Sequence, residues 1–149
     1  MADESTHRQI ANDNETTMDR LLMPNITGGV SSPKDHPWIA VMAYYTAYHL
    51  IEEVVAMVDP DVHLSSHDDQ VEFLLKTPGL GEVSFFYDHL NIMRRYALYR
   101  PPANVSRVTE RQILGYGSPG SFKAVVLDDW LGTIKKTLGE YRESMLSVR

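Results

Sequence analysis

The sequence predicts an all-α protein: an antiparallel bundle of four principal helices, one of them short, with a flexible N-terminal tail. Three observations support this prediction. In several long segments apolar residues recur every three or four positions, which is the spacing of one face of an α-helix. No stretch of useful length alternates apolar and polar residues as a half-buried strand would. Capping residues and prolines stand at the ends of the periodic segments.

The strongest predicted helix begins at Asp35-His36-Pro37 and continues to Val58. Asp35 or His36 occupies the cap, and Pro37 suits the first helical position because its missing N–H would have no helical partner there. Pro60 prevents further extension. Apolar residues cover nearly every side of the segment, so we expect it to be the central and most buried helix.

Three further segments complete the predicted bundle. Ser65 or Ser66 caps a short helix with an apolar face, and a longer helix follows over about residues 82–99. The last helix spans about residues 121–146, where apolar residues step by three or four positions. Residues 101–120 connect these two helices, and connections longer than ~12–15 residues are usually functional or disordered.

The chain has the length of one ordinary domain. Its 149 residues are 43% apolar, which is enough to build a core. Residues 1–20 are mostly polar and are expected to be a mobile tail, whereas the apolar patch over residues 18–23 is expected to dock as a short helix or an extended arm. We therefore expect an N-terminal tail or arm over residues 1–34 and a single helical domain over residues 35–149.

Composition excludes several classes of function. The absence of cysteine removes disulfides, thiolate chemistry and cysteine-ligated zinc. The net charge of −6 gives no general basic surface for nucleic acid, although a local one is compatible with it. The N-terminus has no apolar secretory segment, and the apolar run over residues 39–51 is shorter than the ~20 residues that span a membrane. We expect a cytoplasmic protein that does not enter a membrane.

Charge is segregated along the chain. Six acidic residues and no Lys or Arg stand between Glu52 and Asp69, whereas five Arg and one Glu stand between Arg94 and Arg111. The planar fork of arginine matches phosphate, so the second stretch is a candidate edge for binding an anion or a nucleic acid. The alternative is that these arginines pair with the acidic stretch of the same chain or of a dimer partner.

Histidine and tyrosine supply further candidates. His49, with Glu52, Glu53 and a distant histidine, would form a carboxylate–imidazole metal site. The Glu-x-x-His pair of di-iron bundles is absent, however, so we expect no metal and no cofactor, and a His49 that is hydrogen-bonded in a mostly buried helix. Tyrosines at helical spacing either stack on nucleic-acid bases or serve as core and interface residues.

Three segments occur in an order that points to a known family. These segments are HPWIAVMAYYTAYHLIEEVVA, HLSSHDDQVEFLL and YDHLNIMRRYALYR. They resemble, in turn, the small-and-aromatic first helix, the short helix led by His and Ser, and the later helix with an Arg–Ala–Tyr pattern of the HEPN (higher eukaryotes and prokaryotes nucleotide-binding) superfamily. In this chain the last pattern is Arg95, Ala97 and Tyr99. The resemblance covers about residues 36–100 and implies a homodimer that binds a nucleotide, RNA or a cognate protein, as in toxin–antitoxin pairs.

The resemblance also bears on catalysis. The ribonucleases of the superfamily carry an Arg followed within a few residues by a His, and the two act on the scissile phosphate in a dimer cleft. No His follows Arg95 in this chain, so we expect a non-catalytic module. The alternative is a divergent metal-independent ribonuclease that uses Arg95 with His67 from another helix. The candidate ligand-binding residues are His49, Glu52, Tyr45, Tyr87, Arg94, Arg95 and Tyr99.

Overall fold

The computed structural model describes residues 3–22, 36–99 and 123–148, and the regular structure in these ranges is entirely helical. The elements are α1 (Glu4–Leu22), α2 (His36–Val58), α3 (His67–Lys76), α4 (Gly81–Tyr99), the π-helical η2 (Lys123–Leu131) and α7 (Gly132–Val148). The predicted all-α fold is therefore confirmed. Within these ranges, no helix is both long enough and apolar enough to cross a membrane.

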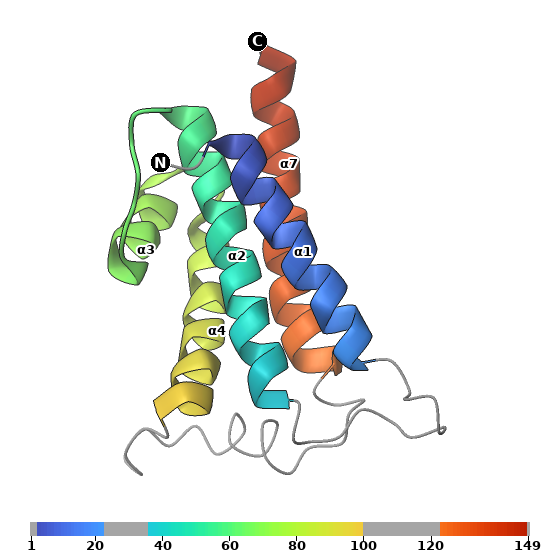
Figure 1. Ribbon diagram of the computed structural model, residues 1–149. Helices are drawn as coiled ribbons and strands as arrows, with labels where there is room; N and C mark the ends of the chain where they lie inside the picture. The colour runs from blue at the N-terminus through green and yellow to red at the C-terminus, as the bar shows by residue number, and fades with distance from the viewer. Residues whose placement is uncertain (1–2, 23–35, 100–122, 149) are drawn as a thin grey trace.

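The long helices lie side by side with alternating directions, as Figure 1 shows. In that view α1 and α4 run downward, whereas α2 and α7 run upward, and η2 leads directly into α7. Helix α2 packs against α1, α4, η2 and α7, and the short α3 packs against α4 in the connection between α2 and α4. The antiparallel bundle predicted from the sequence is confirmed, with α1 as an additional long helix.

The N-terminal segment differs from the prediction. Residues 4–22, expected to be part of a tail, form helix α1, in which Ala11 and Met18 are buried in the common core. Asp3 caps this helix, because its Oδ1 accepts a hydrogen bond from the backbone N–H of Thr6 at 2.9 Å. The expectation of a mobile tail is therefore wrong for this segment. The rest of the predicted arm, residues 23–34, lies outside the described residues, as does the connection over residues 101–120.

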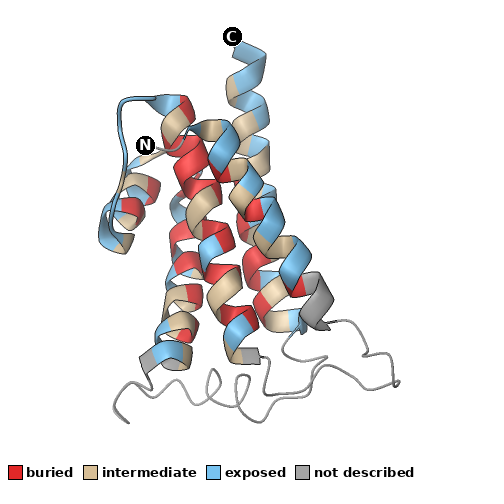
Figure 2. Cartoon of the chain, in the orientation of Figure 1, coloured by how far each residue is buried: buried red, intermediate tan, exposed pale blue. Residues whose placement is uncertain are grey.

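Helix α2 forms the centre of the bundle, as its apolar composition predicts. Figure 2 shows buried residues on nearly every turn of α2 and on the sides of the neighbouring helices that face it. Ala40, Ala43 and Ala47 are fully buried, and small side chains at helix contacts allow neighbouring axes to approach closely. Polar residues of α2 at buried positions must therefore find partners on other elements.

The short helix begins as one of the two predicted caps requires. Ser66 occupies the cap of α3, and its Oγ accepts a hydrogen bond from the backbone N–H of Asp69 at 3.1 Å. Asp68 and Asp69 lie in the first turn, where the helix dipole favours negative charge. This cap fixes the residue at which α3 begins, and therefore the sides of α3 on which His67 and Gln70 lie.

Candidate functional site

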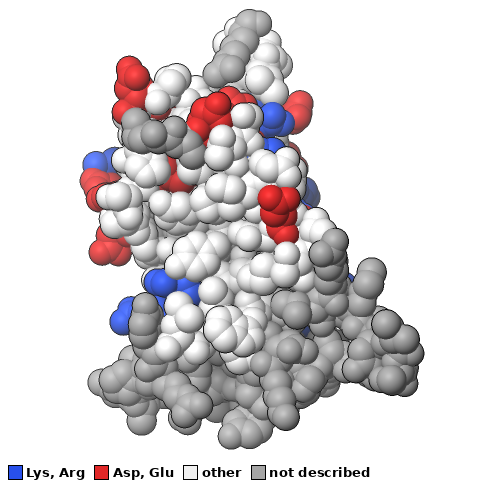
Figure 3. Space-filling view, viewed as in Figure 1, with Lys and Arg blue, Asp and Glu red and all other residues white. Residues whose placement is uncertain are grey.

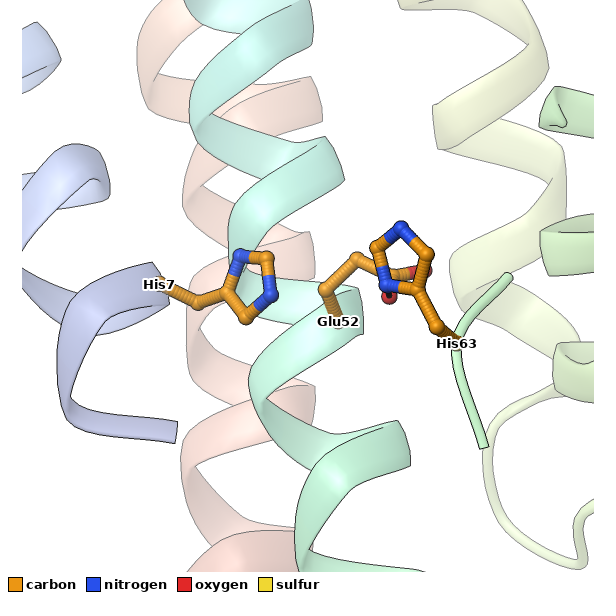
Figure 4. Close-up of side chains that lie close together, drawn as sticks. All are labelled: His7, Glu52 and His63. Carbon is orange, nitrogen blue, oxygen red and sulfur yellow. Dashed lines mark ion pairs between the residues drawn. The ribbon is translucent and has the colours of Figure 1, made fainter. Parts of the chain in front are cut away.

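Four polar side chains converge where α1, α2 and the loop between α2 and α3 meet, and we call His7, His49, Glu52 and His63 the histidine–glutamate cluster. Figure 4 shows three of them: His7 on α1 and His63 on the loop turn their rings toward the carboxylate of Glu52 on α2. His63 Nδ1 lies 3.1 Å from Glu52 Oε2. One nitrogen or oxygen atom from each of these three residues lies within 4.8 Å of the other two. The fourth member, His49, has its Nδ1 2.8 Å from the Nδ1 of His7.

The cluster is desolvated on its inner side and open on its outer side. His7 and Glu52 are 3% and 1% exposed, whereas His63 is an exposed loop residue. Burial lowers the pKa of His7, and burial together with the neighbouring His7 lowers the pKa of His49 to about 4. Both rings are therefore neutral near pH 7. His7, Glu52 and His63 line a cavity of about 540 Å³ at this end of the bundle.

Glu53, the neighbour of Glu52, has a different environment. Arg8 Nη2 on α1 donates a hydrogen bond to Glu53 Oε1 at 2.7 Å. Arg142 Nε on α7 lies 2.7 Å from the same oxygen, which is ion-pair distance without the angle of a hydrogen bond. Glu53 thus joins three helices through one buried carboxylate. The arginines that pair with the acidic stretch, among the described residues, come from α1 and α7 rather than from the predicted arginine stretch.

A buried hydrogen-bonded chain leads from the cluster toward α4. Gln70 is fully buried, and its Nε2 donates to Glu52 Oε1 at 2.9 Å. The hydroxyl of Tyr87, also fully buried, donates to Gln70 Oε1 and lies 3.0 Å from the hydroxyl of Tyr44. Burial raises the pKa of Tyr44 and of Tyr87, so both remain protonated and able to donate.

His67 stands at the other end of this chain. Its Nε2 lies 2.7 Å from Asp88 Oδ1 on α4, and its Nδ1 lies 3.3 Å from the hydroxyl of Tyr44. An imidazole held by a carboxylate is the arrangement that orients a general base. Here, however, both ring nitrogens of His67 are engaged by protein groups. The side chain is 14% exposed, and its contacts join α3 to α2 and α4.

A second grouping lies near the start of α2 and the end of α4. The guanidinium carbon of Arg94 is 4.5 Å from the ring centre of Tyr44 and 5.9 Å from that of Tyr45, within the range of cation–π contact. Trp38 and Tyr45, which are 62% and 38% exposed, are seven residues apart and therefore on the same side of α2. Arg95 is exposed beside Arg94. We call Trp38, Tyr45 and Arg94 the aromatic–arginine face.

The structure therefore divides the predicted ligand-binding residues between two places. His49 and Glu52 lie in the histidine–glutamate cluster, whereas Tyr45 and Arg94 lie in the aromatic–arginine face. Arg95 is the exposed neighbour of Arg94 in α4. Tyr87 belongs to the buried chain between the two places, and the side chain of Tyr99 lies outside the described part of the molecule. The predicted partner of Arg95, His67, is bonded instead to Asp88 and Tyr44.

Sequence reasoning did not assign His7, His63 or Gln70 to a site. His7 lies in the segment expected to be a tail, so its position beside Glu52 could be expected only after recognising that segment as a helix. Comparisons of the chain with protein-family models, with curated proteins and with solved structures gave no match. Functional inference therefore depends on the two groupings themselves.

Proposed function

We propose that this chain is a non-catalytic, HEPN-like helical module that acts as a homodimer and binds single-stranded RNA through the aromatic–arginine face. The observation that carries the proposal is the position of Arg94 over Tyr44 and near Tyr45, on the side of α2 where Trp38 is exposed. A nucleic-acid base that stacks on an aromatic side chain gains ~1–3 kcal/mol. Arginines beside such rings supply partners for the phosphates.

The distribution of charge supports the same face. The chain carries a net charge of −6, so its overall charge repels a polyanion. Figure 3 shows Asp and Glu over the upper part of the bundle, with some Lys and Arg among them, and further Lys or Arg at the lower left, beside α4, with no Asp or Glu next to them. Arg94 Nη2 donates to the neutral Asn91 Oδ1 at 2.9 Å, and among the described residues no carboxylate lies at ion-pair distance from Arg94. A phosphate therefore meets a locally positive surface here.

The test is fluorescence anisotropy with a labelled single-stranded oligoribonucleotide, measured at low and raised salt. We expect Trp38→Ala and Arg94→Ala each to weaken binding about tenfold, because each removes roughly one stacking or phosphate contact. Phe85→Ala and Lys136→Ala, which remove an exposed aromatic and an exposed cation elsewhere, are the matched controls. Equal affinities for Trp38→Ala and the parent chain would contradict the proposal, and light scattering checks the dimer.

A second candidate function is the divergent ribonuclease. The observation in its favour is the His67–Asp88 pair, with Nε2 and Oδ1 2.7 Å apart. Arg95 is seven residues beyond Asp88 and so on the same side of α4. Occupation of both His67 nitrogens makes this candidate the weaker of the two. Cleavage of RNA by the purified chain that His67→Ala and Arg95→Ala both abolish would establish it in place of the non-catalytic module.

A further inference from the structure

We propose that His7, Glu52 and His63 form a binding site for one divalent transition-metal ion of the zinc type. This site is separate from the aromatic–arginine face and does not depend on the function proposed for that face. Two imidazoles and one carboxylate are a donor set that zinc accepts, and three protein ligands with a remaining open position are typical of reactive zinc sites. Cysteine, the other common zinc ligand, does not occur in the chain.

The distances suit this assignment. In a tetrahedral zinc site with bonds of about 2.0–2.1 Å, neighbouring ligand atoms are roughly 3.3 Å apart. His63 Nδ1 and Glu52 Oε2 are already 3.1 Å apart, and the farthest of the three ligand atoms lies within 4.8 Å. A shift of the His7 or His63 ring by up to about 1.5 Å closes the site. Because His63 lies on an exposed loop, such a shift is possible without movement of the core.

The two buried ligands, His7 and Glu52, are each oriented by a neighbour that contacts the polar atom not assigned to the ion. His7 Nδ1 is held by His49 Nδ1 at 2.8 Å, which leaves the opposite nitrogen of His7 for the ion. Figure 4 shows that nitrogen turned toward Glu52. Gln70 Nε2 occupies Glu52 Oε1 at 2.9 Å, which leaves Oε2 on the side of His63. Outer-shell contacts of this kind fix ring tautomers and carboxylate rotamers at metal sites.

The charge of Glu52 is the strongest reason to expect a cation. Its side chain is 1% exposed, and a carboxylate taken out of water requires a compensating positive charge or several donors. Glu53, equally buried, has Arg8 and Arg142. Within the described ranges, Glu52 has no Lys or Arg at ion-pair distance and has only Gln70 and His63 as polar partners. A divalent ion at this position supplies the missing charge.

The ion would remain accessible. The three proposed ligands line the cavity of about 540 Å³ together with Ser5, Gln9 and Val62, among others. A cavity of this volume holds several water molecules, so water can complete the coordination shell. Since His7 is on α1, Glu52 on α2 and His63 on the following loop, the ion would also join three separate segments of the chain.

The experiment is isothermal titration of the untagged, chelator-treated full chain with ZnCl₂ and, separately, NiCl₂, together with thermal unfolding at increasing metal concentration. We expect one ion per chain and a rise in the unfolding midpoint of about 5 °C or more at a hundredfold excess over Kd. His63→Ala and Glu52→Gln should lower the affinity at least tenfold, and Gln70→Leu roughly 10–100-fold. His89→Gln, a histidine of α4 outside the cluster, should bind as the parent chain does.

His63→Ala keeps the test decisive, because its exposed loop position makes misfolding a poor explanation for lost binding. Circular dichroism of each metal-free variant checks the fold independently. Binding of neither ion by the parent chain, or equal affinity in His63→Ala and in the parent, would overturn the site. An equal loss in His89→Gln would likewise overturn it, since it would show binding by surface histidines in general. In each of these cases the cluster is a hydrogen-bonded group only.

Discussion

Tyr87→Phe tests whether the buried chain between α3 and α4 stabilises the fold. Tyr87 is fully buried, and its hydroxyl donates to Gln70 Oε1 while lying 3.0 Å from the hydroxyl of Tyr44. The substitution removes one oxygen atom and keeps the packing of the ring, which stacks on Tyr44 at 5.1 Å between centres. Its main effect is therefore to leave the carbonyl oxygen of Gln70 buried without this donor.

The expected cost follows from that orphaned acceptor. A buried polar group deprived of its partner destabilises a protein by about 1–3 kcal/mol. Tyr44 contributes little to the loss, because its hydroxyl keeps His67 Nδ1 as a neighbour at 3.3 Å. For a chain of this length 1 kcal/mol corresponds to roughly 2–4 °C, so the unfolding midpoint should fall by about 3–10 °C.

The assay is urea unfolding followed by far-ultraviolet circular dichroism, with the denaturant dependence compared between variants to confirm that the same surface unfolds. Tyr45→Phe is the matched control, because Tyr45 is 38% exposed and water can replace its contacts. The control should lie within about 0.5 kcal/mol of the parent. If Tyr87→Phe also lay within that limit, Gln70 would have another donor and the chain would not be a stabilising element.

Three further predictions use the same assay. Gly79→Ala should destabilise the fold by about 1 kcal/mol, because the φ of +88° at Gly79 strains an L side chain. Gly139→Ala should instead stabilise the fold by up to about 1 kcal/mol, because Gly139 lies in a helix and a Cβ there meets nothing within 4 Å. His49 has a pKa of about 4 in the folded state, below its value near 6.5 in the unfolded state. The contribution of His49 to stability is therefore complete above pH 6.5 and is lost as the pH falls toward 4, by roughly 1–2 kcal/mol after allowance for partial exposure. His49→Gln should make stability depend less on pH over this range. In metal-free protein Glu53→Gln should lower the free energy of unfolding by about 1–2 kcal/mol, because it weakens two arginine contacts. Glu52→Gln should change that free energy by less than about 0.5 kcal/mol. Equal losses of stability in the two variants would contradict the environments assigned to Glu52 and Glu53.

The helices that were predicted from the sequence share strong local signals. Helix α2 combines Pro37 at its start with an almost continuous apolar surface, and α3 begins at a serine cap. Helix α1 was missed because its mean composition is polar and only a narrow stripe meets the bundle. The spacing of that stripe was nevertheless present: His7, Ala11 and Met18 are buried, at intervals that fit one helical face. Mean polarity was the wrong measure for a helix that contacts its neighbours along one line.

The candidate sites were predicted less completely, because they depend on which elements become neighbours. Glu52 and His49 were selected from their place in α2, but the other two members of the proposed metal site, His7 and His63, are 45 residues earlier and 11 residues later than Glu52 in the chain. No spacing rule connects His7 with His63. The aromatic–arginine face was easier to anticipate, since the tyrosines of α2 and the arginines of α4 are each conspicuous in the sequence. Only their contact, with Arg94 over Tyr44, required the fold.

The contrast between Glu52 and Glu53 connects the fold to the proposed chemistry. Successive residues of a helix point about 100° apart, so two adjacent acids on a central helix must face different neighbours. Glu53 faces α1 and α7, where Arg8 and Arg142 neutralise it, and this contact holds the bundle together. Glu52 faces histidines and an amide at the edge of a cavity, an arrangement that stabilises a buried carboxylate poorly unless a cation is bound. An acidic residue with a purely structural role would be expected to have arginine partners, as Glu53 does. The histidine and amide neighbours of Glu52 instead suit the role proposed for it as a metal ligand.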